Sequence, residues 1–347
     1  MSTTKNHHFV PKGYLRQFGI GTKNDLYLWK IDLSKPNLRP QKSSIGKDLC
    51  SEKDFYRINP QESFIAYSIG NDPNIVEDKG FPYENDLPKI LKKLTEKGVY
   101  SQTLSWKDTK IFIFALISIK YRNPFTRGAY ETGIHVVESN RSSAYELIDE
   151  IMAKVSPQET QLFNHANELY KKFEYDMNNP HELLKTLHSG AFQMGDDRGS
   201  LMDKFKNLGN HLLNAKWEII RTNSNHQFII SDNPGIFLSK HNIWSLVFEN
   251  FENHGIDRFF FPLSPLNGLL IHLGKKDNNL YEGADKIIPV LWAPHRVREY
   301  NICHCSHANK LLIGSSEKAL IEAATEGKSD WINITTMFEN DKKRLNS

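Results

Sequence analysis

The spacing of apolar residues changes twice along this chain, and no other feature constrains its fold as strongly. Residues 25–31 and 54–58 are short runs of aromatic and branched side chains, which predict strands. Between about 83 and 215 the apolar residues recur every three or four positions, which predicts several helices. Strand-like alternation returns after residue 216. The pattern predicts an α+β fold, in which an antiparallel or mixed sheet core built from N- and C-terminal segments carries an inserted all-helical subdomain.

These changes also set the expected domain boundaries. Residues 1–60 together with 216–330 should form the α+β core, and residues 61–215 should form the helical subdomain. Residues 331–347 are expected to be a polar C-terminal tail. No internal repeat or low-complexity tract interrupts this division.

Strand pairs in the core are expected where two strand-like runs are joined by turn residues. Residues 217–221 and 227–231 flank a short polar stretch and predict one hairpin. Residues 259–261 and 269–273, joined through Pro262-Leu263-Ser264-Pro265, predict another. The end of the core predicts a helix, a strand and a helix, over residues 295–307, 311–314 and 317–324.

Several helices are marked by signals at their ends. Pro11 begins a short helix that the glycines after Phe18 end. A longer helix begins near Ser105 and stops before Pro124, because a residue that precedes proline is pushed out of the helical region. The run Ser156-Pro157-Gln158-Glu159 combines a capping serine, a first-turn proline and a glutamate that can reach back to the cap. Two further helices are predicted over residues 181–194 and 201–215.

Composition bounds the function only loosely. A chain of 347 residues can bury a core without a structural metal, so a bound metal would be functional. The formal charge of +3 comes from 44 basic and 41 acidic residues, so nucleic-acid binding is neither implied nor excluded. Three cysteines and the lack of a secretory signal predict a cytoplasmic location. The longest apolar run, residues 111–119, is far shorter than the roughly 20 residues that span a bilayer, so no membrane association is expected.

Four motifs spread along the chain form a characteristic set. They are His7-His8-Phe9-Val10-Pro11 with Tyr14-Leu15-Arg16 and Phe18, then Arg122-Asn123-Pro124, Ser231-Asp232-Asn233-Pro234 and Phe261-Pro262-Leu263-Ser264-Pro265. With this set the chain resembles the bacterial domain-of-unknown-function family 4238 over nearly its whole length. The resemblance implies no activity, but it implies candidate site positions: His7, His8, Arg122, Asp232, Asn233 and Asn301. At Asn123 the family pattern leads us to expect a threonine, so no hydroxyl role is carried over there.

The pair His7-His8 resembles the opening of a His-Asn-His nuclease, in which one histidine is a general base and its neighbour helps to hold a metal. Such a site needs an asparagine and a second histidine or asparagine some tens of residues downstream. Asn24 could be the middle residue, but the third member is missing, and no histidine occurs between His8 and His135. Two alternatives therefore stay open. One histidine caps the Pro11 helix or fills a polar pocket, or the pair contributes to a site assembled from distant segments.

Two other candidates have equally good structural explanations. Asp232 lies between a predicted strand and Pro234, where a carboxylate can hold a metal or orient a histidine, but Asp-Asn-Pro is also a strong turn former. Arg122 can grip a phosphate through its planar guanidinium, or it can cap the carbonyls of the preceding helix.

Three weaker patterns concern residues outside these motifs. Cys303 and His307 share a helix face and could ligate one metal ion, although a packing face of small residues explains them as well. Arg298 and His304 match the residue types of a metal-independent ribonuclease, but they lie about 120° apart on a regular helix. Glu77-Asp78-Lys79 could be half of a restriction-type nuclease site with Asp54, although such tripeptides are common by chance.

The leading hypothesis is a cytoplasmic hydrolase that acts on nucleic acid, a metal-dependent nuclease-like enzyme serving as a toxin or phage-defence effector. A divalent metal, Mg²⁺ or Mn²⁺, would be bound by His8 and Asp232, and Arg122 would neutralise phosphate charge. One alternative is a non-enzymatic protein that binds a protein partner or a second copy of itself, with a structural N-terminal motif. The other alternative is a metal-independent ribonuclease.

Overall fold

A five-stranded sheet forms the centre of the protein, in the order β11-β6-β10-β9-β8. All neighbours in this sheet are antiparallel except β11, which runs parallel to β6, so the sheet is mixed. In chain order its strands are β6 (Ala215–Arg221), β8 (Ile236–Ser239), β9 (Ile256–Ser264), β10 (Asn267–Lys276) and β11 (Pro289–Leu291). The computed structural model describes residues 6–22, 25–45, 49–96, 104–131, 134–156, 160–190, 208–239, 256–276 and 289–345.

A second sheet joins the two ends of the chain. Its order is β2-β3-β12-β7, and β4 also pairs with β3. Its strands are β2 (Ile20–Thr22), β3 (Asp25–Asp32), β4 (Gln41–Ser44), β7 (Ile230–Ser231) and β12 (Leu311–Gly314). A separate two-stranded ribbon pairs β1 (Asn6–His8) with β5 (Ser51–Lys53). The predicted α+β class, with sheets built from N- and C-terminal segments, is confirmed.

Between β5 and β6 the described part of the chain contains only helices and the turns between them. They are α2 (Phe64–Ile69), α3 (Ile75–Lys79), the 3-10 turn η2 (Pro82–Glu84), α4 (Leu87–Thr95), α5 (Trp106–Tyr121), α6 (Pro124–Glu131), α7 (Ile134–Ser139), α8 (Arg141–Met152), α9 (Thr160–Asn178), α10 (Pro180–Gly190) and a helical stretch over 208–213. Outside this block lie α1 (Lys12–Leu15) with the 3-10 turn η1 (Arg16–Phe18), α12 (Pro294–His307) and α13 (Glu317–Leu345).

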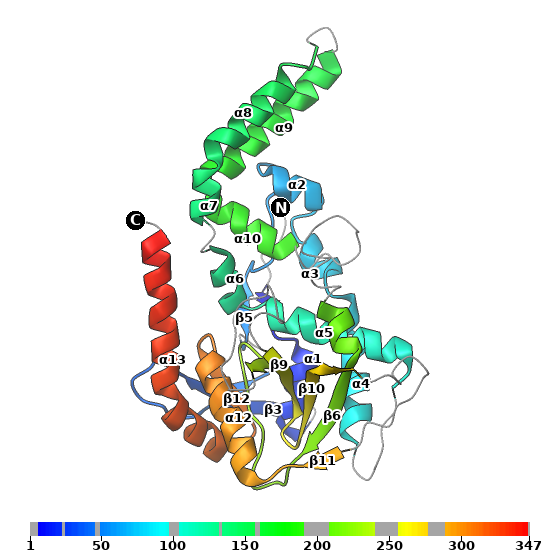
Figure 1. The fold of residues 1–347 in the computed structure, drawn as a ribbon, viewed down its shortest axis with the longest axis vertical. Coiled ribbons are helices and arrows are strands. Elements are labelled where there is room, and N and C mark those ends of the chain that lie inside the picture. The colour runs from blue at the N-terminus through cyan, green and yellow to red at the C-terminus, as the bar shows by residue number, and fades with distance from the viewer. Residues whose placement is uncertain are drawn as a thin grey trace.

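Strand alternation places β9 between two hydrophobic clusters. Phe259 and Phe261 face a large cluster that contains buried residues of α4 and α5. Phe260 points to the opposite face and packs with Trp292 and with Tyr300 of α12. The central sheet is therefore covered by helices on both faces, as Figure 1 shows for α5 and α12.

Helix α5 begins and ends where the sequence predicts. The Ser105 hydroxyl accepts the backbone N–H of Asp108 at 3.1 Å, which satisfies one free donor of the first turn. Arg122 is the C-cap residue, and Asn123 separates it from Pro124, the first residue of α6. Phe112 and Leu116 of α5 are fully buried in the same cluster as the sheet, so the first helices of the block share the core of the strands.

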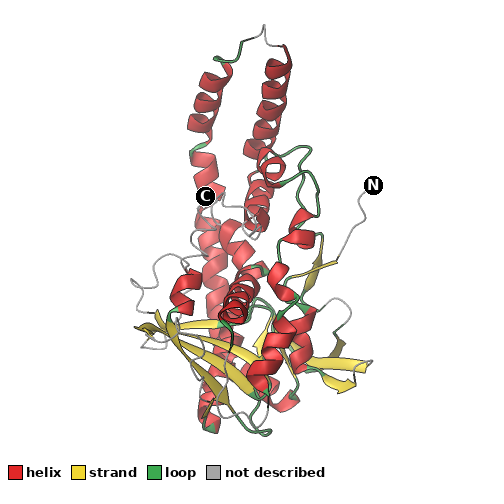
Figure 2. Cartoon of the chain, turned by 90° about the vertical axis from the view of Figure 1, so that its right-hand side faces the viewer, coloured by secondary structure: helices red, strands yellow, loops and turns green. Residues whose placement is uncertain are grey.

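The later helices of the block extend away from that core. α8 and α9 form a hairpin that projects at the top of Figure 1 and stands out again in the turned view of Figure 2. Tyr145 and Phe173 join the two helices with a ring-centroid distance of 5.5 Å. No residue of α8 is fully buried, so this hairpin is held by half-buried contacts.

Some local predictions are wrong. Residues 54–58 do not form a strand, because β5 ends at Lys53 and Asp54 has a positive φ of 55° that turns the chain. The predicted hairpin of 217–221 with 227–231 does not form, because β6 pairs with β10 while β7 pairs with β12 in the other sheet. Alternation identifies strands but not their partners.

Other predictions hold in the described part of the chain. The hairpin of β9 with β10 and the final succession of α12, β12 and α13 are confirmed. The last helix is longer than the predicted 317–324, because α13 continues through residues 331–345, the segment expected to be a polar tail. The predicted helix start at Ser156-Pro157-Gln158-Glu159 lies mostly outside the described residues, as do residues 191–194 and 201–207 of the two predicted helices.

Candidate active site

An open groove of about 800 Å³ lies beside the N-terminal motif and contains two of the predicted site residues, His8 and Arg122. They come from motifs that are far apart in the sequence. The other residues that line the groove are Asn6, Pro11, Lys12, Gly13, Glu77, Asp78, Lys79, Phe81, Pro82, Glu84 and Asn85.

The strand β1 separates the roles of the two adjacent histidines. Successive side chains of a strand point to opposite faces. His7 is fully buried, and its Nδ1 accepts the backbone N–H of Tyr56 at 2.9 Å. The two rings stack with a centroid distance of 5.8 Å. His8 is half-buried and lines the groove. His7 therefore anchors the N-terminal segment to the core, and His8 is the histidine of the pair that lines the groove.

Arg122 forms the wall of the groove and is only 1% exposed. Its Nε donates to the Phe9 carbonyl at 3.1 Å, and its guanidinium lies over the Phe81 ring at 4.2 Å. Nη1 forms an ion pair with Glu84. Nη2 is buried and has no hydrogen-bond partner among the described residues. A guanidinium with a remaining donor can bind one more oxygen acceptor.

The groove also holds charges of both signs. Glu77, Asp78 and Glu84 provide carboxylates, and Lys12 and Lys79 provide ammonium groups. Burial raises the pKa of Glu84, although the neighbouring Arg122 acts against this shift. An imidazole beside carboxylates and cations is the kind of site that can transfer protons and hold an anionic oxygen.

The structure does not bring Asp232 into this groove. Its Oδ1 accepts the N–H of Asn309 at 2.9 Å, and its Oδ2 accepts the N–H groups of Lys310 and Leu311 at 2.9 and 3.0 Å. Burial raises the pKa of Asp232 to about 6, although these backbone donors act against the rise. Asp232 thus fastens β7 to the start of β12, a structural role that joins distant segments and differs from the local turn considered from the sequence.

These contacts bear on the predicted metal shared by His8 and Asp232. Both oxygens of Asp232 already accept backbone donors, so this pair does not fit a shared ion. Among the described residues, no group of three or more His, Cys, Asp and Glu side chains is arranged to hold a metal. The divalent metal remains a prediction from the sequence.

Asn233 lies in a buried polar network next to the site. Its Oδ1 accepts Lys120 Nζ at 2.8 Å and Asn123 Nδ2 at 3.0 Å, while its own Nδ2 donates to the His307 carbonyl at 2.7 Å. Burial lowers the pKa of Lys120 to about 7. Sequence reasoning missed Lys120, whose only signal is its position directly after the apolar run 111–119. The asparagine at 123 therefore bonds the second motif to the third.

The last predicted site residue, Asn301, is a structural clamp. Its Oδ1 accepts the N–H of Ile229 at 3.1 Å, and its Nδ2 donates to the carbonyl of Gln227 at 2.9 Å. Both partners lie just before β7, so Asn301 ties α12 to that segment. Asn301 is not among the described residues that line the groove with His8.

The late helix does not assemble the other predicted sites. Arg298 is exposed and pairs with Glu326, whereas His304 is fully buried with Nδ1 against the Tyr300 carbonyl, so the two do not share a ribonuclease site. His307 Nδ1 lies 2.6 Å from the Cys303 carbonyl of its own helix. Cys305 packs so tightly against α13 that a Cβ on Gly327 would lie 2.7 Å from its Cβ. Cys303, on another face of the helix, packs against the cluster that contains Phe260, Trp292 and Tyr300, which agrees with the packing interpretation.

The four motifs are joined by hydrogen bonds. Tyr14 Oη donates to the Pro262 carbonyl at 2.6 Å, which connects the first motif to the fourth. Arg122 connects the first to the second through Phe9, and Asn123 connects the second to the third through Asn233. The motif residues thus form one continuous junction, and His8 and Arg122 of this junction line the groove.

Comparison with known proteins gives one match. The family model described as "Protein of unknown function (DUF4238)" matches residues 6–318, in agreement with the resemblance of the motifs. Neither the comparison with curated proteins nor that with solved structures gave a match. In the described residues, no helix combines the length and apolar character needed to cross a membrane.

Proposed function

The chain belongs to the DUF4238 family, and we propose that the groove lined by His8 and Arg122 is the active site of a hydrolase acting on nucleic acid. One observation carries the proposal. His8 lines the same groove as Arg122, a buried cation whose Nη2 has no hydrogen-bond partner in the described part of the chain. A phosphate oxygen supplies the acceptor that this donor lacks.

The remaining groove residues suit the same chemistry. His8 is the general base for the attacking water, or the acid for the leaving oxygen. Arg122 stabilises the negative charge that develops on the phosphate. Glu77 and Lys79, half of the restriction-type pattern, line the groove, whereas Asp54 lines a different cavity. In the groove, Glu77 is the carboxylate partner of His8, the role expected from the sequence for Asp232.

We keep the requirement for Mg²⁺ or Mn²⁺ in the proposal and test it by adding each ion to the assay, but we assign no chemical step to the metal. The proposed biological setting is the bacterial cytoplasm, where nucleic-acid cleavage would serve as a toxin or phage-defence function. Expression of the wild type and of His8→Ala in a bacterial host, followed by growth and phage plating, tests that setting.

The enzymatic test uses single-stranded and duplex DNA and RNA, each with Mg²⁺, with Mn²⁺ and with a chelator. We expect cleavage by the wild type and a loss on the order of 100-fold or more in His8→Ala, the usual contribution of a general acid or base. His295→Ala, a change on the exposed side of α12, is the matched control and should keep full activity. An inactive wild type, or equal activity in His8→Ala, refutes the proposal.

A second candidate is a protein that binds a partner through the α8–α9 hairpin. Leu147, Ile151 and Leu162 are 60%, 48% and 51% exposed on this projecting hairpin, which Figure 2 shows well away from the sheets. Under this alternative the N-terminal motif is purely structural. His8→Ala should then lower the melting temperature by several degrees and metal ions should shift it in neither protein. A folded, equally stable His8→Ala protein contradicts this role.

A further inference from the structure

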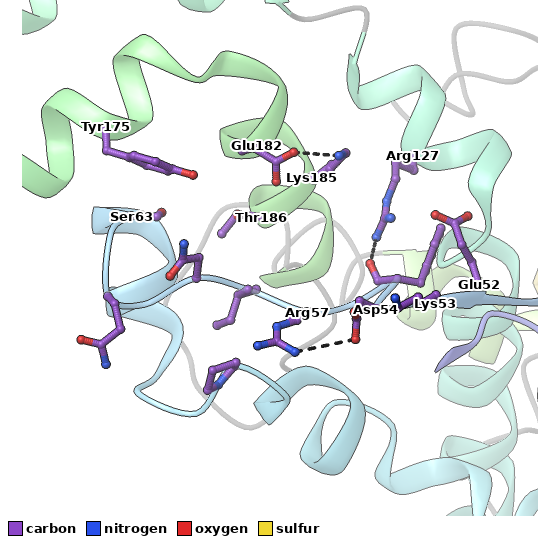
Figure 3. Close-up of a pocket in the computed structure, with 15 residues that line it drawn as sticks. Glu52, Lys53, Asp54, Arg57, Ser63, Arg127, Tyr175, Glu182, Lys185 and Thr186 are labelled. Carbon is purple, nitrogen blue, oxygen red and sulfur yellow. Dashed lines mark hydrogen bonds and ion pairs between the residues drawn. The ribbon is translucent and has the colours of Figure 1, made fainter. Parts of the chain in front are cut away.

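A second cavity, of about 510 Å³, lies beside β5, the partner strand of β1 in the two-stranded ribbon. β1 contributes Asn6 and His8 to the groove, whereas β5 contributes Glu52 and Lys53 to this cavity. Figure 3 shows its walls, with the segment after β5 on one side and α9 and α10 on the other. Its volume is within the range of small-molecule sites in proteins.

Four cations from separate elements converge on the cavity. Lys53 comes from β5, Arg57 from the segment after it, Arg127 from α6 and Lys185 from α10. Arg127 is only 7% exposed, and its guanidinium lies 3.4 Å over the Phe55 ring, with Nη2 donating to the Phe55 carbonyl. These contacts fix a positive charge in the wall.

Two of these four cations form an ion pair with a carboxylate that also lines the cavity. Arg57 pairs with Asp54 at 3.8 Å, and Lys185 pairs with Glu182 at 2.8 Å. Each pair joins residues three positions apart on one wall, and Figure 3 shows the two pairs on opposite sides of the hollow. Partly exposed pairs of this kind contribute at most about 1 kcal/mol, so a stronger anion can displace the carboxylates. Glu52 is the only other carboxylate in the described lining.

The rest of the lining distinguishes the two ends of the cavity. Thr186 lies beside Lys185 on α10 and is only 7% exposed, so its hydroxyl is a nearby donor. Tyr175 of α9 presents its ring at the end of the cavity away from Arg127, as Figure 3 shows. A charged group therefore fits between the cations, and a planar organic group fits against the tyrosine.

We propose that this cavity binds a small molecule that carries a phosphate group, with the phosphate between Arg57 and Lys185 and the organic part toward Tyr175. A dianionic phosphate has enough oxygens to meet both walls at once, and arginine can bind two of them together. The site is separate from the groove of the proposed hydrolase and does not depend on that activity.

Isothermal titration calorimetry with adenosine monophosphate and with inorganic phosphate tests the proposal. We expect the wild type to bind at least one of them, and Arg57→Gln and Lys185→Gln each to weaken that binding on the order of tenfold, the effect of losing one charge-assisted hydrogen bond. Both side chains are partly exposed, so the variants should fold. Lys171→Gln removes the same charge from an exposed position of α9 outside the cavity and should bind as the wild type does.

The two probes distinguish a site for free phosphate from a site for a phosphate that is part of a nucleotide. If inorganic phosphate binds to the wild type and binds more weakly to both variants, the phosphate site is supported without its organic part. Binding of the nucleotide only, weakened in both variants, supports the site together with its organic part. His8→Gln should leave either result unchanged, because His8 lies in the groove. No heat with either probe up to about 10 mM, or wild-type affinity in both cavity variants, overturns the proposal.

Discussion

Replacement of His188 should change the acid sensitivity of the protein by a predictable amount. His188 is fully buried at the junction of α10 with α5 and α6. Its Nε2 lies 3.1 Å from the Tyr121 carbonyl, and its Nδ1 lies 3.5 Å from Arg127 Nε. Burial, and then the charge of Arg127, lower the pKa of His188 from 6.5 to about 3. The folded protein therefore keeps this histidine neutral at pH values at which the unfolded chain protonates it.

The sign and size of the effect follow from proton linkage. Between pH 6.5 and about 3 the unfolded state binds one more proton at His188 than the folded state, so stability is full above pH 6.5 and falls as the pH decreases. The slope is about 1.4 kcal/mol per pH unit for one proton. His188 alone should therefore lower the free energy of unfolding by about 2 kcal/mol between pH 7 and pH 5.

Other buried groups titrate in the same range, so the test compares two proteins. Burial lowers the pKa of His304 to about 4 and that of His307 to about 3, which adds to the loss of stability in acid. The raised pKa of Asp232, about 6, acts in the opposite direction, because the folded state then binds the additional proton. These contributions cancel when His188→Gln is compared with the wild type.

The assay is urea-induced unfolding at pH 7 and at pH 5, followed by tryptophan fluorescence. His188→Gln should be less stable at pH 7, because hydrogen bonds of the ring are lost. Its further decrease at pH 5 should be smaller than that of the wild type by about 2 kcal/mol. His165→Gln, at an exposed position of α9, should decrease as the wild type does. An equal decrease in the wild type and in His188→Gln would refute the reasoning.

Three further substitutions test the junction between the motifs by urea unfolding at pH 7. Gly235 has a φ of 82°, and a Cβ there would lie 2.8 Å from the Phe261 ring. The free energy of unfolding of Gly235→Ala should therefore be lower by about 1–3 kcal/mol. Unchanged stability would contradict this strain. The free energy of unfolding of Asp232→Asn should be lower by about 1–3 kcal/mol, because an amide donor replaces an oxygen that accepts backbone N–H groups. A fully stable but inactive variant would instead favour a catalytic role for Asp232. Asn301→Ala should lose a similar amount, because the N–H of Ile229 and the carbonyl of Gln227 lose their partner. The control is Asn309→Ala, at a half-buried position whose bond to Asp232 is made by the backbone N–H that the substitution keeps.

The fold was predictable where a local signal decides the structure. The capping serine at 105 and the proline at 124 define α5 without reference to the rest of the chain. The partner of β6 could not be predicted, because alternation in 217–221 is equally compatible with a neighbour at 227–231 and with one at 267–276. Asp54 also escaped prediction, since its positive φ depends on the turn that follows β5 rather than on a glycine.

Only part of the candidate groove could be predicted from the sequence. The motifs identify His8 and Arg122, yet only the fold shows that Glu77 and Lys79 share their groove. Alternation along a strand could have assigned one histidine of the pair to each face, but three residues of β1 are too few for the sequence to predict that strand. Lys120 was missed because a lysine at the end of an apolar helix usually extends to solvent.

The contacts of Arg122 determine which residues can test the chemistry. The Tyr56 hydroxyl donates to its carbonyl at 2.9 Å, its Nε bonds the Phe9 carbonyl, and its Nη1 pairs with Glu84. Removal of this side chain would leave the half-buried Glu84 carboxylate and the buried Phe9 carbonyl without their donor, so the loss of activity and the loss of folding would coincide. His8 and Glu77 are only half-buried, and their replacement leaves the Arg122 contacts in place. Because these two variants separate catalysis from stability, the proposed hydrolase depends on their behaviour, and Arg122 becomes informative only after them.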